Sequence, residues 1–123
     1  SRCVIALHRP DGPSALFAVT EMRLRLAEDH IRVADVAAFK GEEPTELIPS
    51  TPPFIVVEVV SRDDRHVDIL MKLEEYRQWG VSHIWLVDPW TRKLHVFTGS
   101  LEEVEKLEIK NLAISISGPG LFD

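Results

Sequence analysis

The sequence predicts an α/β fold with a mixed β-sheet and one crossover helix. Residues 54–60 form an apolar, β-branched run on both alternating faces, interrupted only by Glu58, which is typical of a central strand covered on both sides. Apolar residues with helical spacing follow at 67–79, and a second apolar strand follows at 81–87. A strand, a helix and a strand in this order predict a parallel pair of strands joined by a right-handed crossover.

The chain has the length and composition of one globular domain. Its 123 residues are enough for one hydrophobic core, so we expect a single domain over residues 1–123, with the 45% apolar and 28% charged content of ordinary soluble proteins. No apolar run approaches the roughly 20 residues that span a bilayer, and we expect no membrane association. The single cysteine, Cys3, excludes an internal disulfide bond and favours a reducing, cytoplasmic location.

Two antiparallel strands are expected before the central strand. Residues 3–7 are apolar and fit either a strand or the end of a helix, and a turn rich in Pro and Gly follows at 10–13. Residues 16–26 alternate as a strand with one wet face. After a hairpin loop at 27–30, residues 31–39 form the second strand of the pair.

The segments around the crossover helix carry loop and cap signals. Residues 40–53 are acidic and contain four prolines, which predicts a surface loop. We expect the helix to open at Ser61, with Asp63 and Asp64 in its first turn, where acidic side chains suit the positive end of the helix dipole. Gly80 is expected to end the helix as a C-cap.

The C-terminal part is expected to extend the sheet. A turn at 91–93 follows the strand at 81–87, and residues 94–98 pair back on it as a hairpin. Apolar residues alternate with small or polar ones around 112–116, which predicts one or two further strands in the tail.

Two acidic residues in apolar strands are the strongest functional signal. Glu58 lies in the middle of the central strand, and Asp35 is the only polar residue in the run 33–39. Burying an ionised carboxylate costs several kcal/mol unless a metal ion or a partner compensates. On neighbouring strands the two carboxylates could share one Mg²⁺ or Mn²⁺ ion, which activates water against a phosphoryl group. Either acid alone could instead accept hydrogen bonds from a loop or face water at the end of the sheet.

Lys72 is a third candidate, with two interpretations. It borders the apolar stripe of the helix between Ile69 and Tyr76, so its amine could reach along the core to the strand ends and stabilise a phosphate. The alternative is an ordinary helix ion pair with Asp68, worth about 0.3–0.5 kcal/mol, and from the residues alone this alternative is favoured.

The order of the segments resembles the Uma-type family of restriction endonucleases, a branch of the PD-(D/E)XK nuclease superfamily. The resemblance covers residues 18–97. It rests on RVADVA at 32–37, PPFIVVEVVS at 52–61, DDR at 63–65, KLEEY at 72–76, GV at 80–81 and IWLVDP at 84–89.

The resemblance implies a restriction-endonuclease-like core that hydrolyses DNA phosphodiester bonds with Mg²⁺ and leaves a 5′-phosphate and a 3′-hydroxyl. It makes Asp35 the first metal-binding acid and Glu58 the acid of the D/E-x-K element. Val60 occupies the position of the superfamily lysine, and Lys72 on the following helix matches the place where this family supplies it. The catalytic set is therefore expected to be Asp35, Glu58 and Lys72.

The sequence also departs from the family pattern. Ala34 stands where the family often has proline before the first acid. The family's N-terminal helical segment, whose acid can assist the metal, is expected to be missing or truncated before Ser1. Glu21 on the preceding strand is not assigned that role.

A catalytically inactive domain that keeps this fold for DNA or protein binding, or for assembly, is the alternative function. The chain has 14 Lys and Arg against 20 Asp and Glu, a net charge of −6, whereas DNA-binding proteins normally present a basic face. Unpaired strand edges and exposed tryptophans predict a homodimer in either case.

Overall fold

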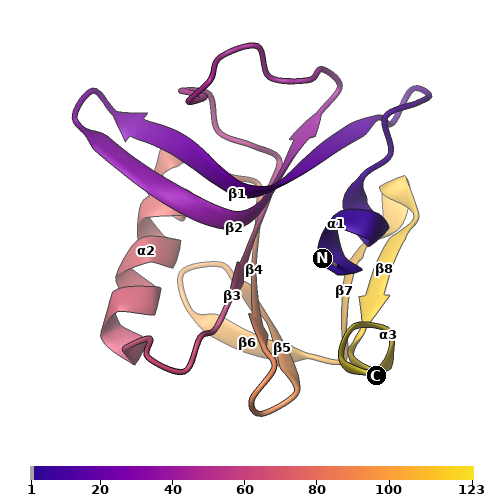
Figure 1. Cartoon of the computed structure of the whole chain (residues 1–123). Coiled ribbons are helices and arrows are strands. Elements are labelled where there is room, and N and C mark those ends of the chain that lie inside the picture. The colour runs from indigo at the N-terminus through magenta and orange to yellow at the C-terminus, as the bar shows by residue number, and fades with distance from the viewer. Residues whose placement is uncertain (1) are drawn as a thin grey trace.

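The computed structural model describes residues 2–123, and its centre is a six-stranded sheet in the order β1-β2-β3-β4-β5-β6 (Figure 1). β3 and β4 are parallel, and the other neighbouring strands are antiparallel. The predicted mixed sheet is therefore confirmed. Its strands are β1 (Leu16–Ala27), β2 (His30–Lys40), β3 (Ile55–Val59), β4 (His83–Asp88), β5 (Lys93–Phe97) and β6 (Leu101–Val104).

Helices and a small second sheet cover the two faces of the central sheet. Helix α2 (His66–Trp79) connects β3 to β4 and lies on one face (Figure 1). The other face is covered by α1 (Arg2–Leu7) and by the two-stranded sheet of β7 (Lys106–Ile109) and β8 (Ile114–Ser117). A 3-10 turn, η1 (Lys110–Leu112), joins β7 to β8, and α3 (Gly118–Phe122) follows β8. The apolar stretch at 3–7 is thus a helix.

Burial on both faces explains why β3 is apolar at successive positions. Ile55 and Val57 pack against the layer of α1, β7 and β8. Val56 points the opposite way, into the cluster that includes Leu73 and Tyr76 of α2. Because side chains alternate along a strand, Glu58 shares the face of Val56 and lies under the crossover helix.

Helix α2 begins later than the sequence predicts. It starts at His66, so Asp63 and Asp64 precede the helix rather than occupy its first turn. The Asp64 carboxylate accepts a hydrogen bond from the backbone N–H of Ser61 at 2.8 Å, and the Asp64 N–H donates to the Ser61 carbonyl at 3.1 Å. This closed turn satisfies the backbone locally and delays the helix. The predicted C-cap is confirmed, since Gly80 adopts φ 114°.

The C-terminal tail contains more strands than expected. Beyond β5 it forms β6, β7 and β8, where one or two strands were predicted. Each is four residues long, and the charged sequence of 101–109 leaves few apolar positions to mark a strand. β7 nevertheless buries Leu107 and Ile109 against the central sheet.

Candidate active site

A pocket of about 310 Å³ lies at the carboxyl end of β3, between β2, β3 and the start of α2. The structure brings the side chains of Asp35, Glu58 and Lys72 together in its wall. Two further acids, Asp64 and Asp68, line the same pocket. Asp35, Glu58 and Lys72 therefore meet at one place in the fold, although Asp35 and Lys72 are 37 residues apart in the sequence.

Glu58 is the buried acid of this site. It is 7% exposed and is the one charged residue with a buried position between residues 2 and 123. The Lys72 amine donates to its Oε1 at 2.9 Å, and the Tyr76 hydroxyl donates to its Oε2 at 3.1 Å. Lys72 and Tyr76 are four residues apart on α2, so they lie on the same face of the helix and both reach the carboxylate.

Burial dominates the electrostatics of Glu58. It raises the pKa of the carboxyl from 4.5 to about 7, although the Lys72 charge and hydrogen bond oppose the shift. The negative charge of Asp35 raises the pKa further, as expected for two carboxylates that face one pocket. The same surroundings raise the pKa of Tyr76, first through burial and then through the charge of Glu58. The ionised form of Glu58 is therefore only partly compensated by protein groups.

Lys72 is held between two strands. Its amine donates to the Val33 carbonyl at 2.7 Å as well as to Glu58, and its side chain is 24% exposed. The ion pair with Asp68 that helix spacing favours is absent among residues 2–123. Lys72 pairs with Glu58 rather than with Asp68 because a neighbouring cation stabilises a buried carboxylate more than an exposed one.

Asp35 lies on β2 next to β3. Its Oδ2 accepts a hydrogen bond of 2.6 Å from the backbone N–H of Val59, which fixes the carboxylate beside the end of β3. On β1, Glu21 has φ 48° between the paired positions Thr20–Val36 and Met22–Ala34. The backbone of the hairpin is therefore irregular directly opposite Asp35, as strand irregularities beside functional sites often are.

The donors of the pocket suit a hard divalent cation with an open coordination shell. Mg²⁺ usually takes one or two carboxylates and completes its octahedron with water and substrate phosphates. Within residues 2–123, no group of three or more His, Cys, Asp or Glu side chains is arranged to hold a metal ion. Asp35 and Glu58 are the residues of the pocket that could contribute carboxylate oxygens to such an ion, with water and phosphate as the further ligands. A cation would add to the positive charge that Lys72 already places beside Glu58.

Sequence reasoning assigned no role to three residues of this region. Tyr76 bonds Glu58, and Arg32 lines the pocket while Glu75 binds the Arg32 guanidinium. The available signals were the position of Arg32 three residues before Asp35 and of Tyr76 four residues after Lys72.

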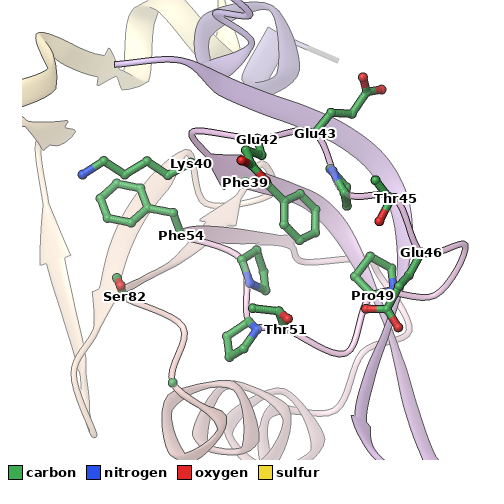
Figure 2. A pocket seen from close by; sticks show the side chains of 14 residues that line it. Phe39, Lys40, Glu42, Glu43, Thr45, Glu46, Pro49, Thr51, Phe54 and Ser82 are labelled. Atoms are coloured by element: carbon green, nitrogen blue, oxygen red, sulfur yellow. The ribbon is translucent and has the colours of Figure 1, made fainter. Parts of the chain in front are cut away.

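A second pocket, of about 420 Å³, lies at the opposite end of β3 (Figure 2). The loop 40–53 forms it together with Phe39, Phe54, Gly80 and Ser82. Figure 2 shows Lys40 beside the Phe54 ring. The Lys40 Nζ lies 4.8 Å from the centre of that ring. Ligands of open α/β sheets bind outside the carboxyl ends of parallel strands. This pocket is at the amino end of β3 and β4, so the pocket around Glu58 is the candidate active site.

No tryptophan lines the pocket that contains Asp35 and Glu58. Trp85 is buried in β4, whereas Trp90 is 57% exposed, with the Arg62 guanidinium 4.7 Å from its ring centre.

None of the helices in the described part of the chain is both long and apolar enough to cross a membrane.

The fold is thus a mixed sheet with an acid on each of the neighbouring strands β2 and β3 and a lysine on the crossover helix. Residues 2–122 match the model of a family described as "Uma2: Putative restriction endonuclease". The chain belongs to this family, as its sequence motifs predict.

A solved structure shares the fold. It is the crystal structure of a protein described as "a putative nuclease belonging to DUF820 from Anabaena variabilis ATCC 29413". The two superpose with a TM-score of 0.80 at 20% sequence identity, over 98% of this chain and 75% of the other. A search of curated proteins found no match.

Proposed function

We propose that this protein is a metal-dependent DNA endonuclease that hydrolyses phosphodiester bonds. The single observation that carries the proposal is the 2.9 Å contact between the Lys72 amine and the Glu58 carboxylate, in a pocket that Asp35 also lines. Family membership supports the same reaction class. A structural ion pair alone would not need a second acid and an open pocket beside it.

The three side chains have separate roles in this proposal. Asp35 and Glu58 would hold a divalent ion, Mg²⁺ or Mn²⁺, through carboxylate oxygens. When bound, the ion supplies positive charge beside the phosphate and favours the ionised form of a water molecule. The Lys72 amine is close enough to Glu58 to orient that water and to stabilise charge on the phosphate oxygens. Water attacks phosphorus, the bond to the 3′ oxygen breaks, and the products are a 5′-phosphate and a 3′-hydroxyl.

Plasmid cleavage tests the proposal. Purified protein with Mg²⁺ or Mn²⁺ should nick supercoiled DNA, and Glu58→Gln, Asp35→Asn and Lys72→Met should each lower the rate by at least about 100-fold, as expected for groups that act on the transition state. Glu103→Gln is the matched control, because Glu103 is an exposed acid on β6 and its loss makes the same change in charge.

Two results would count against a nuclease. Cleavage that is equal in wild type and in all three site variants indicates a contaminating enzyme. No cleavage by the folded wild type with either ion favours the alternative, an inactive domain that uses the same fold for binding or assembly.

We further propose that the protein is a homodimer that acts on DNA in the cytoplasm. The support for the dimer is that the sheet has two edge strands, β1 and β6, and that β-branched side chains are exposed on the β1–β2 hairpin. These side chains are Val19, Ile31 and Val33. Light scattering should give twice the mass of one chain at micromolar concentration; the mass of one chain throughout would contradict the dimer. The cytoplasmic location stays a prediction from the cysteine content.

A further inference from the structure

We propose that Arg32 binds a DNA phosphate beside the acid pair, and that Glu75 positions its guanidinium for this contact. The inference rests on the proposed nuclease function and adds a substrate-binding residue to it. Arg32 lies on β2, three residues before Asp35, and lines the same pocket as Glu58 and Lys72.

The guanidinium of Arg32 is fixed from one side. Its Nε donates to Glu75 Oε1 at 3.0 Å and one terminal nitrogen donates to Oε2 at 2.8 Å, so the pair is bidentate across the gap from β2 to α2. The Nε2 of His30 lies 2.5 Å from the same Oε1. The hydrogen bonds with Arg32 come first among the causes that lower the pKa of Glu75 to about 2, so Glu75 remains an anion at neutral pH.

The rest of the guanidinium is available to a ligand. Arginine has five N–H donors, and the bidentate pair uses one on Nε and one on a terminal nitrogen. Within residues 2–123 the hydrogen bonds of Arg32 all go to Glu75, and the second terminal nitrogen makes none. The side chain is 31% exposed. Donors therefore remain at the wall of the pocket, in the planar geometry that suits phosphate oxygens.

The charges of the pocket favour a cation with free N–H donors. Two cations line it, Arg32 and Lys72, against four acids: Asp35, Glu58, Asp64 and Asp68. Lys72 is already bonded to Glu58 and to the Val33 carbonyl. Lys72 keeps one of its three N–H donors, whereas Arg32 keeps three of its five, so Arg32 offers more free donors to a phosphate that enters this acidic pocket.

Glu75 contributes by holding the guanidinium still. A side chain that is already ordered in its binding geometry loses less conformational freedom when the ligand arrives. Glu75 faces Arg32 rather than the acid pair, so its effect on DNA passes through Arg32. Glu75 is therefore a positioning residue in this proposal. The alternative is a structural role, in which the Arg32–Glu75 pair fastens the β1–β2 hairpin to α2.

The salt dependence of DNA binding separates the two roles. Duplex DNA is titrated with full-length protein in Ca²⁺ at several salt concentrations, and a gel verifies that the DNA stays intact. If Arg32 contacts one phosphate, Arg32→Met should reduce the slope of log K against log salt by about 0.9, and Arg32→Lys should retain it.

Arg77 and Glu74 provide a matched control on the same helix. Arg77 binds Glu74 bidentately at 2.8 and 2.5 Å but does not line the site pocket. Arg77→Met should leave the slope unchanged. Glu75→Gln should keep the slope but weaken binding severalfold, because Arg32 is present but no longer fixed, and Glu74→Gln should do neither.

Failure of this inference differs from failure of the nuclease proposal. Arg32→Met and Arg77→Met with equal slopes would overturn the phosphate contact, even if the wild type cleaves plasmid. A lower melting temperature for Arg32→Met with the slope of wild type would assign Arg32 a structural role only. A loss of about 0.9 in slope supports the contact whether or not cleavage is seen.

Discussion

The burial and the raised pKa of Glu58 follow from the face of β3 on which its side chain lies. Its neighbours Val57 and Val59 point to the other face, and Glu58 itself points under α2, where burial raises its pKa to about 7. The acid is tolerated because Lys72 and Tyr76 bond both of its oxygens. A buried acid whose pKa is strongly raised is more typical of a functional site than of an ordinary protein interior.

The raised pKa predicts how stability depends on pH. Between about pH 4.5 and 7 the folded chain keeps a proton on Glu58 that the unfolded chain has released, so the free energy of unfolding falls as pH rises through this window and levels off above it. In EDTA, wild type should lose about 2.5 kcal/mol more than Glu58→Gln between pH 5 and pH 8. Urea denaturation at both pH values measures the difference.

The same comparison contains its own control. Glu103→Gln removes an exposed acid and should follow the wild-type pH dependence. If Glu58→Gln and wild type lose the same stability between the two pH values, Glu58 does not carry the raised pKa.

Site residues differed in how far the sequence revealed them. Asp35 and Glu58 stood out because each interrupts an apolar strand, which is a local signal. Helix spacing alone favoured Asp68 as the partner of Lys72, since it cannot report a carboxylate on a distant strand, and only the family resemblance indicated otherwise. The local signal for Arg32, its position three residues before Asp35, was not specific, because an arginine on a half-exposed strand has many uses.

At the scale of elements, helix α2 connects the parallel strands and supplies Lys72 and Tyr76. Its C-terminal end was predictable from Gly80, whereas its start was not. A turn closed by the Asp64 side chain on Ser61 competes with the first helical turn, and such local hydrogen bonds are invisible to a pattern of apolar spacing.

Replacing Gly80 should destabilise the fold through the backbone. At φ 114° a side chain is strained, while an added Cβ would meet only Pro52 Cγ at 3.6 Å, an ordinary contact. Gly80→Ala should therefore lower the free energy of unfolding by about 1–2 kcal/mol. Gly118→Ala is the control, because Gly118 is not in the left-handed region and its Cβ would lie 3.7 Å from Phe122. Equal stabilities of the two variants in urea would contradict this.

At the scale of the whole molecule, the net charge of −6 opposes an approach to DNA. Four acids line the candidate pocket itself, so a bound divalent ion should change the local potential from repulsive to attractive.

Duplex affinity should accordingly increase when Ca²⁺ is added at constant ionic strength. The increase should be lost in the double variant Asp35→Asn, Glu58→Gln. It should persist in Glu102→Gln, Glu103→Gln, which changes the net charge equally on the exposed strand β6. Fluorescence anisotropy measures both, and an equal response of the two double variants would contradict a site-specific effect.

The central sheet was largely predictable, and the covering layer was not. Strong periodicity marked β1 to β5, and the order strand, helix, strand fixed the parallel pair. The pairing of β7 with β8, and their packing with α1, depends on contacts between the two ends of the chain. Residues such as Leu7 and Leu107 are fully buried there, but short amphipathic segments do not reveal their partners.

Titration of the protein with Mn²⁺ by calorimetry tests the central claim most directly. If Asp35 and Glu58 share one cation, wild type should bind Mn²⁺ at one site per chain, Glu58→Gln should bind at least about tenfold more weakly, and Glu103→Gln should match wild type. Equal binding in wild type and Glu58→Gln, or no binding in either folded protein, would contradict the account.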